Sequence, residues 1–361
     1  MAESVKVIDP NSGAGYDYDS LYDWEAAQQA DIDTSNTIAV AKCRCTGGTA
    51  DTTAVTIDGW TTSATDYIKI WTDPAESYRH NGTYQTGNKY RIVSTQTSGN
   101  ILSNVESYTV TDGIQFYVNA TSITNNLTCI DLSAPIFILN SILRGPSSTL
   151  NGGYYLHGIN TTYQTSGTSF VINSLVYNFV EPTGGGASIG IHQNNTGCSS
   201  RLYNCTVINC TSYGIRENQG TVTVKNCYSG GAGSNYVNGT LTTCASSDTT
   251  GTAGLQNIAV NTTNFTNITA ASEDYHLPVG SALIGVATNL YNDATYPFQT
   301  DIDGQDRGGA AAAWDIGADQ YNPIALYYRT AATPTALSAA SWVLYTAPFT
   351  SLGIIQLKAQ A

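Results

Sequence analysis

Two short phrases of the chain hold the residues best suited to chemistry. His192 lies in GIHQN, and Arg216 and Glu217 lie in GIREN, with a Gly-Ile pair opening each phrase. Aligning the two pairs puts His192 and Arg216 at the same phase of successive repeats, so we expect them side by side on one surface. A histidine beside an arginine can bind an anionic sugar, and a carboxylate such as Glu217 can serve acid–base catalysis. The alternative is an ordinary polar row at the rim of a sheet.

Few other candidates accompany this group. His157, in LHGIN, stands one residue ahead of its own Gly-Ile pair, so we expect its side chain on the opposite face. Between Asn100 and Val260 no two carboxylates fall at the same phase of neighbouring repeats. Tyrosines along this stretch can stack on sugar rings, or they simply favour strands: Tyr154, Tyr155, Tyr163, Tyr177, Tyr203, Tyr213, Tyr228 and Tyr236.

Acidic residues near the carboxyl end indicate a second kind of chemistry. Asp301 and Asp303, with Asp306 close behind, resemble part of an oxygen-donor loop for calcium. The full helix–loop–helix calcium signature is not met, because the glycine falls at the fourth place and Ala312 stands where the bidentate glutamate belongs. The alternative is a structural turn in which Arg307 pairs with one of the carboxylates. We predict no cofactor for the chain, with calcium at these aspartates as the alternative.

The composition favours an all-β framework for these residues. The 361 residues include 34 glycines and 24 tyrosines, and only 11% are charged, against ~25% in an ordinary soluble domain. Such a chain is typical of short strands and many turns. The formal charge is −13 and no basic cluster occurs, so we expect neither nucleic acid nor a membrane surface as a partner.

Two phrases recur along the middle of the chain. An asparagine phrase returns at intervals of 33, 31 and 22 residues, at Asn140, Asn173, Asn204 and Asn226. A Gly-Ile phrase runs beside it and is expected to open a short strand each time, at Gly113-Ile114, Gly158-Ile159, Gly190-Ile191 and Gly214-Ile215. Irregular periods of this size predict a solenoid, in which each coil buries its face against its neighbours.

The cysteines share this periodicity. Cys205 directly follows Asn204, and Cys227 directly follows Asn226, so we expect the two thiols to stack from coil to coil. None of the cysteine spacings matches a structural zinc pattern. We therefore predict that the eight cysteines fill the interior as small apolar groups, with disulfides or a metal site as the alternatives.

Two strings near the carboxyl end resemble the terminal signature of right-handed parallel β-helix proteins of the pectate-lyase-like superfamily: DYHLPVGSALIGVA (274–287) and TDIDGQDRGGAAAAWDIGADQY (300–321). That signature consists of a Tyr-His-Leu strand, an Asp-x-Asp-Gly-x-x-Arg turn and an Asp-Ile-Gly-Ala strand. The resemblance implies an all-β, single-stranded right-handed parallel β-helix. It implies no activity, since enzymes, adhesins and particle proteins share the signature. The aspartate pair and Gly-His-Gly string of the superfamily's hydrolases have no counterpart in this sequence.

The amino-terminal region contains the one convincing helix. It is expected within 17–33, with Ser20 at the N-cap and one face formed by Leu21, Trp24, Ala27 and Gln28. Such a helix covers the open first coil of a solenoid. Strands are expected to follow at 38–43, 54–60, 67–73 and 89–93.

Three parts are predicted along the chain. Residues 1–34 form an N-terminal strand and the capping helix, residues 35–321 form the β-helix, and residues 322–361 form a C-terminal extension. This extension is strongly apolar, which predicts docking on a partner or a sister subunit. The docking residues are expected to be Trp342, Leu344, Tyr345, Phe349, Ile354, Ile355 and Leu357.

These features lead to a functional hypothesis. The opening region loosely resembles β-helical proteins of bacteriophage particles, which implies a structural, non-enzymatic protein at the virion surface, as a capsid decoration or fibre-like component. We expect it to bind glycans, to attach to capsid or tail proteins through its C-terminal extension, and to form a homotrimer. The amino terminus shows no apolar leader, which agrees with release by lysis.

Two alternatives remain for the function. The first is a carbohydrate-active enzyme, a tailspike-like polysaccharide lyase or glycoside hydrolase that uses His192, Arg216 and Glu217. The second is an extracellular adhesin.

Overall fold

The computed structural model describes residues 2–146, 150–180 and 182–322, together with the backbone of three strands further along the chain. The chain divides into two units, residues 1–320 and residues 321–361, and each is described by itself.

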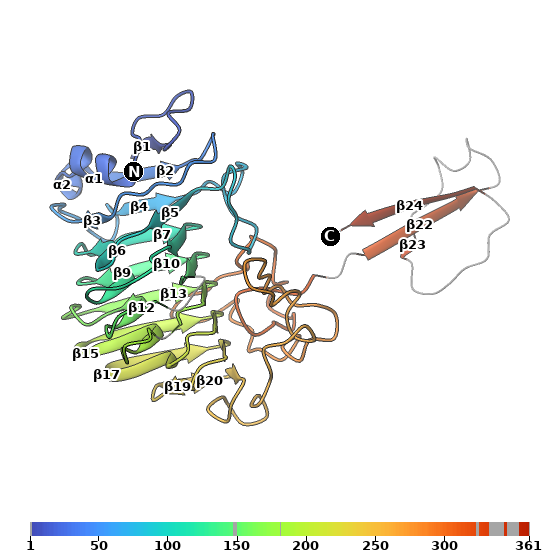
Figure 1. The fold of residues 1–361 in the computed structure, drawn as a ribbon. Helices are drawn as coiled ribbons and strands as arrows, with labels where there is room; N and C mark the ends of the chain where they lie inside the picture. The colour runs from blue at the N-terminus through green and yellow to red at the C-terminus, as the bar shows by residue number, and fades with distance from the viewer. Residues whose placement is uncertain are drawn as a thin grey trace. The chain divides into compact units, whose positions relative to one another are not determined.

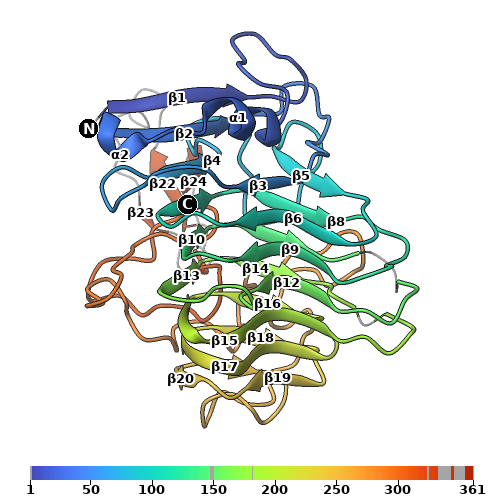
Figure 2. The same ribbon diagram turned by 90° about the vertical axis from the view of Figure 1, so that its left-hand side faces the viewer.

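The first unit is nearly all-β, and its strands form three rows that run along the unit (Figures 1 and 2). The first row contains β3 (Val55–Ile57), β6 (Gly99–Asn104), β9 (Leu127–Leu132), β12 (Leu156–Asn160) and β19 (Ser234–Val237). The second row contains β1 (Ala2–Ile8), β2 (Thr37–Cys43), β4 (Ile68–Trp71), β7 (Thr109–Asp112), β10 (Ile136–Leu139), β13 (Thr168–Ile172) and β20 (Thr240–Thr242). The long strands β15 (Ser188–Tyr203) and β17 (Tyr213–Lys225) belong to both rows and join them into one sheet.

The third row is a separate seven-stranded sheet. It contains β5 (Arg91–Ser94), β8 (Gln115–Val118), β11 (Ile142–Arg144), β14 (Leu175–Tyr177), β16 (Thr206–Ile208), β18 (Tyr228–Gly230) and β21 (Ala245–Ser246). Strands that neighbour one another in the same row pair in parallel, and the chain visits the rows in turn. The all-β prediction is therefore confirmed, and the long parallel sheets agree with the predicted solenoid.

An asparagine ladder marks the corner between the second and third rows. Its members are Asn140, Asn173, Asn204 and Asn226, and all four have left-handed backbones with φ between 46° and 54°. Asparagine tolerates this conformation better than most residues, which explains its recurrence. The side chains also bond from coil to coil, because Asn173 Nδ2 donates to Asn140 Oδ1 at 3.2 Å and Asn226 Nδ2 donates to Asn204 Oδ1 at 3.1 Å.

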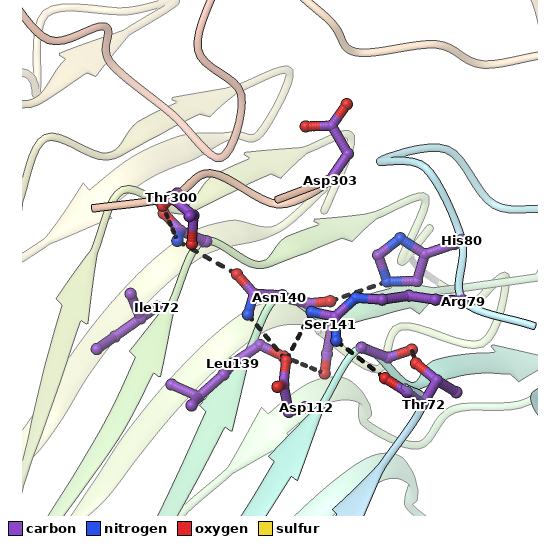
Figure 3. A network of polar contacts seen from close by, with 12 residues as sticks. Thr72, Arg79, His80, Asp112, Leu139, Asn140, Ser141, Ile172, Thr300 and Asp303 are labelled. Atoms are coloured by element: carbon purple, nitrogen blue, oxygen red, sulfur yellow. Dashed lines mark hydrogen bonds and ion pairs between the residues drawn. The ribbon is translucent and has the colours of Figure 1, made fainter. Parts of the chain in front are cut away.

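The upstream end of the ladder carries a network of polar contacts (Figure 3). Asn140 Nδ2 donates to Asp112 Oδ1 at 2.8 Å, and Arg79 pairs with the same carboxylate at 2.7 Å. His80 Nδ1 accepts the backbone N–H of Gly82, so its Nε2 carries the proton and donates to the Asn140 carbonyl at 2.8 Å. Burial lowers the pKa of His80 to about 3, which keeps this imidazole neutral. His80 therefore has a structural role, since both of its ring nitrogens bond to the protein backbone.

The Gly-Ile phrase is less uniform than its sequence indicates. Ile159, Ile191 and Ile215 do stand in one register. Gly113, however, lies directly after β7, and its N–H donates to the Leu139 carbonyl just as the ladder asparagines donate one coil later. Placing Gly113 in the Gly-Ile series was therefore wrong. The residue occupies the left-handed ladder position, which glycine fills as readily as asparagine.

The amino-terminal helix is shorter than predicted. Helix α1 spans Leu21–Gln28, and a second helix, α2, spans Ile32–Ser35. Ser20 caps α1 as expected, since its side chain accepts the N–H of Asp23. Trp24 is buried and stacks on Trp60 with ring centroids 5.4 Å apart.

The buried face of α1 also differs from the prediction. Ala27 is exposed, and Glu25 is buried instead. The reason is that the Glu25 carboxylate accepts the N–H groups of Asp58 and of the Trp60 indole.

Aliphatic side chains and thiols fill the space inside the coils. The eight cysteines are all buried and free of disulfides, which confirms the prediction that they act as interior filling. Cys205 and Cys227 stack as expected, with the Cys205 N–H donating to the Cys227 sulfur at 3.3 Å. Burying a Val, Leu or Ile side chain contributes roughly 1.5–3 kcal/mol, so the stacked interiors supply most of the stability.

Residues 247–320 run back along the coils without further ladder strands. The strands implied by the terminal signature are absent from this fully described stretch, where Asp274 and Trp314 take part only in isolated bridges. The physical reason lies in the asparagine ladder, which takes up backbone groups of this segment. Asn173 Nδ2 donates to the Thr300 carbonyl at 2.6 Å, and Asn204 Nδ2 donates to the Asp315 carbonyl at 3.0 Å.

Arg307 anchors this returning segment. Its guanidinium is buried and donates to Asn173 Oδ1 at 3.1 Å and to the Ala318 carbonyl at 2.7 Å. Its other acceptors are the carbonyls of Thr300, Gly317 and Asp319 and the side chain of Gln320. The hydrogen bonds of Arg307 thus go to neutral oxygens, and Asp301 and its neighbouring aspartates attract the guanidinium from further away, in place of the direct pairing that was expected.

The second unit contains a small antiparallel sheet. Strand β22 (Ala325–Ala331) pairs with β23 (Val343–Leu344) and with β24 (Ile354–Gln360). Of the predicted docking residues, Leu344 lies on β23, and Ile354, Ile355 and Leu357 lie on β24. Trp342, Tyr345 and Phe349 lie outside the described residues. Within the described part of the chain, no helix is long and apolar enough to cross a bilayer.

Candidate functional site: a polar groove on the first row

A groove of about 600 Å³ runs over the outer face of the first row. It crosses β6, β9, β12, β15 and β17, and each of these five neighbouring strands contributes residues to its lining. Most of the lining residues carry an amide or a hydroxyl group. The complete lining consists of Ser98, Gly99, Asn100, Asn125, Asn126, Thr128, Asp131, Tyr155, His157, Asn160, Thr162, Tyr163, His192, Asn194, Arg216 and Asn218.

One line of polar residues crosses the groove in strict register. Asp131 pairs with Asn160, Asn160 with His192, and His192 with Arg216. The predicted neighbourhood of His192 and Arg216 is therefore present in the structure. Asn160 Nδ2 also donates to Asp131 Oδ1 at 2.7 Å.

His157 lies in the same groove, which corrects the expectation that it points to the opposite face. The cause is a bend at Gly158, which together with Ile159 turns inward. A Cβ on Gly158 would lie 2.7 Å from the interior atom Val176 Cγ1, and Ile159 is fully buried in the core. Because two successive residues face inward, His157 and Asn160 both face outward, although simple alternation would separate them.

The two groove histidines stack on each other. The ring centroids of His157 and His192 are 5.3 Å apart with an interplanar angle of 13°, and Tyr155 stacks on the other side of His157. Only 5% of His157 and 6% of His192 is exposed. None of the four ring nitrogens has a hydrogen-bond partner among the described residues. Buried polar atoms of this kind are rare in folded proteins and call for an explanation.

Both imidazoles are neutral at physiological pH. Burial lowers the pKa of His157 to about 3, and the nearby His192 and Arg216 lower it further. Burial and the charge of Arg216 lower the pKa of His192 to about 4. A neutral imidazole offers one donor and one acceptor.

The charged residues of the groove are Asp131 and Arg216. Burial raises the pKa of Asp131, and the hydrogen bond from Asn160 opposes this shift. Arg216 lies over the Tyr213 ring at 4.5 Å and forms no ion pair with any described residue. Sequence reasoning missed Asp131, because it lies in a coil without the Gly-Ile phrase. Its place in the groove follows from the pairing of Asp131 with Asn160, which the structure provides and the residue types alone do not.

Glu217 does not line the groove. It pairs in register with Gln193, whose side chain is buried, and its Oε2 accepts the N–H of Val222 at 2.7 Å. The structure therefore brings His192 and Arg216 together, whereas the Glu217 carboxylate bonds to the backbone of its own strand, β17.

The predicted calcium ligands occupy the returning segment. Asp301 accepts the N–H groups of Gln305 and Gln320, and Asp306 accepts the N–H of Gly308. Asp303 faces His276 instead, with 3.6 Å between Oδ2 and Nε2. Asp301 also accepts the N–H of Asp303 at 3.3 Å, and burial together with the neighbouring Asp303 carboxylate raises the pKa of Asp301 to about 8. Calcium binding by these three residues stays a prediction.

One other arrangement has the composition of a metal site. His276, Asp303 and Asp319 bring possible ligand atoms within 4.8 Å of one another, the one such group among the described residues. Burial alone would lower the pKa of His276, but its hydrogen bond with Asp274 at 2.6 Å and the carboxylate of Asp303 3.6 Å from Nε2 raise it to about 11. The protonated ring offers no lone pair to a metal. Without a bound ion, Asp274 and Asp303 form an ion-paired cluster with the His276 ring.

The comparisons with known proteins leave the class of the protein open. No protein-family model matches the chain, and no curated protein matches it.

Proposed function

We propose that the chain is a glycan-binding structural protein, built as a single right-handed parallel β-helix like those of the pectate-lyase-like superfamily. The parallel rows and their coil-to-coil register support this fold. The resemblance of residues 274–321 to the superfamily's terminal signature supports it as well. One observation carries glycan binding: a polar groove with an aromatic rim follows the coils across five strands.

The chemistry of the groove suits sugars. Amides, hydroxyls and neutral imidazoles exchange hydrogen bonds with sugar hydroxyls, and exposed aromatic faces stack on sugar rings. Tyr155 and Tyr163 supply such faces, with Tyr163 63% exposed. Neighbouring strands are ~4.8 Å apart, which is close to the length of one pyranose unit. A glycan lying along the coils therefore meets one set of side chains per sugar.

Glycan binding is tested on an array of neutral and acidic oligosaccharides. We expect the intact chain to bind a defined subset, and Tyr163→Ala to weaken that binding about fivefold to tenfold through loss of stacking. Tyr22→Ala is the matched control, since Tyr22 is an exposed tyrosine on α1, away from the groove. Absence of binding on the whole array would contradict the proposal.

Within the same proposal the protein is a surface component of a bacteriophage particle. Its support is the loose resemblance of the opening region, together with the apolar C-terminal extension, which we propose as the attachment to capsid or tail proteins and as the contact in a homotrimer. Peptide mass spectrometry of gradient-purified particles tests this setting. A fixed ratio to the major capsid protein is expected, and absence from particles would contradict it.

A carbohydrate-active enzyme is the second candidate function. Hydrolysis by paired carboxylates has little support, because Asp131 is the only carboxylate among the described groove-lining residues. A lyase needs a base, and the neutral imidazoles of His157 and His192 are available for that role, but their pKa values of about 3 and about 4 make them weak bases. Incubation of the bound glycans with the protein distinguishes the candidates: intact glycans support the binding protein, and shortened products support the enzyme.

A further inference from the structure

Arg216 is an unpaired positive charge in a strongly acidic protein. The chain carries 27 acidic residues against 14 lysines and arginines, yet Arg216 has no carboxylate partner among the described residues. Asp131 stands three strands away in the same register line, about 14 Å at the usual strand spacing. The groove therefore carries an acidic and a basic residue about three strands apart, and the guanidinium lies over the aromatic ring of Tyr213.

The two stacked histidines share the groove with Arg216. Each neutral ring holds an N–H donor, and neither donor has a partner among the described residues. The four nitrogens are shielded from solvent, so an acceptor in the groove beside Arg216 reaches a donor once a ring has rotated. If all hydrogen-bond donors of the groove had acceptors in the protein, no ligand would be needed to satisfy them. Here the donors of three side chains lack an acceptor among the described residues, and a ligand could supply the oxygen atoms.

From this arrangement we propose that His157, His192 and Arg216 form an anion subsite, which takes the acidic group of a glycan lying in the groove. The inference rests on the proposed glycan binding and names the class of ligand. Arginine favours planar or tetrahedral oxyanions because its N–H groups can bond two oxygens at once. Carboxylate and sulfate groups both satisfy this chemistry.

Other occupants fit less well. Arg216 repels a metal cation, and two nearly parallel rings cannot direct lone pairs at one ion. A neutral sugar would leave the guanidinium charge without a counterion. Asp131 repels an anion in its own part of the groove, so the acidic group is confined to the part near Arg216.

The subsite is tested with paired probes on the intact protein. The probes are uronate and sulfated oligosaccharides from the array, their carboxyl-reduced and desulfated counterparts, and inorganic sulfate at constant ionic strength. We expect the acidic forms to bind about tenfold more tightly than the matched neutral forms. Arg216→Gln should abolish this preference, and Arg201→Gln, on the second row, should keep it. The reduced and desulfated probes separately identify carboxylate and sulfate as the favoured group.

Histidine ring resonances supply an internal control. The chain has four histidines, and on addition of sulfate we expect the signals of His157 and His192 to move while those of His80 and His276 stay in place. Equal binding of acidic and neutral glycans, or an unchanged preference in Arg216→Gln, overturns the subsite but leaves glycan binding intact. Unmoved His157 and His192 signals also overturn it. Failure of every glycan to bind defeats the proposed function itself.

Discussion

Two regions of the first unit treat buried polar groups in opposite ways. At the asparagine ladder, Arg307 is buried and its guanidinium reaches six oxygen acceptors. In the groove, Arg216 has no carboxylate partner among the described residues, and the four ring nitrogens of His157 and His192 have no hydrogen-bond partner there either. The polar groups of the ladder bond to one another and to the returning segment, and so hold the coils and that segment together. The groove leaves its polar groups available, as binding sites commonly do.

This contrast separates similar residues by their surroundings. His80 and His192 are both buried and neutral, but His80 bonds through both ring nitrogens, whereas His192 bonds through neither. A buried histidine therefore points to a ligand only when its partners are missing. The contrast can be tested from both sides.

The largest effect is expected at Arg307. Arg307→Met should lower the free energy of unfolding by about 3–5 kcal/mol, because it leaves several buried acceptors without a donor. Arg216→Met should change it by less than about 1 kcal/mol, since Arg216 has no acceptor to lose. Urea denaturation of the two variants measures the difference. Equal losses would mean that the two arginines play the same structural role.

A pH dependence of stability follows from His276. Its folded pKa of about 11 lies above the ordinary value of 6.5, so the folded state holds a proton that the unfolded state releases. The stabilisation is complete below pH 6.5 and is lost as the pH rises toward 11, at no more than ~1.4 kcal/mol per pH unit. Denaturation between pH 6 and 10 should show this decline, and His276→Gln should flatten it. An equally steep decline in the variant would assign the proton to another group.

A smaller effect is expected at Asn173. Asn173→Gly keeps the left-handed backbone and removes only the side-chain hydrogen bonds, which should cost about 1–2 kcal/mol. Asn173→Ala should cost about 1 kcal/mol more, because alanine is strained at this φ. Urea denaturation of both variants separates the two contributions. Equal stabilities would remove backbone conformation as the reason for the recurring asparagine.

The sequence predicted the stacked parallel strands from the residues at their corners. Asn140, Asn173, Asn204 and Asn226 recur because one backbone position in each coil is left-handed, and that requirement is readable in residue types. Gly113 was misplaced because glycine satisfies the same requirement and also occurs at bends. The returning segment was read as strands, since no pattern in its sequence reveals that its carbonyls bond to side chains of the ladder.

The groove was predicted only in part. His192 and Arg216 share a phase in neighbouring repeats, so their contact could be read from alignment. The bend at Gly158 reverses the alternation of side chains, which placed His157 on the wrong face in the prediction. The place of Asp131 depends on the register of β9 and β12, and the place of Glu217 depends on its hydrogen bond from the Val222 N–H within β17. Both depend on backbone geometry that residue types do not encode.

The most direct test of the account replaces both groove histidines by phenylalanine. His157→Phe with His192→Phe removes four unpartnered nitrogens and keeps two stacked rings, so the free energy of unfolding should stay the same or rise. Glycan binding, measured by calorimetry on the same samples, should fall at least tenfold. A loss of more than about 2 kcal/mol in stability with binding retained would contradict the account, because it would make the two histidines part of the framework.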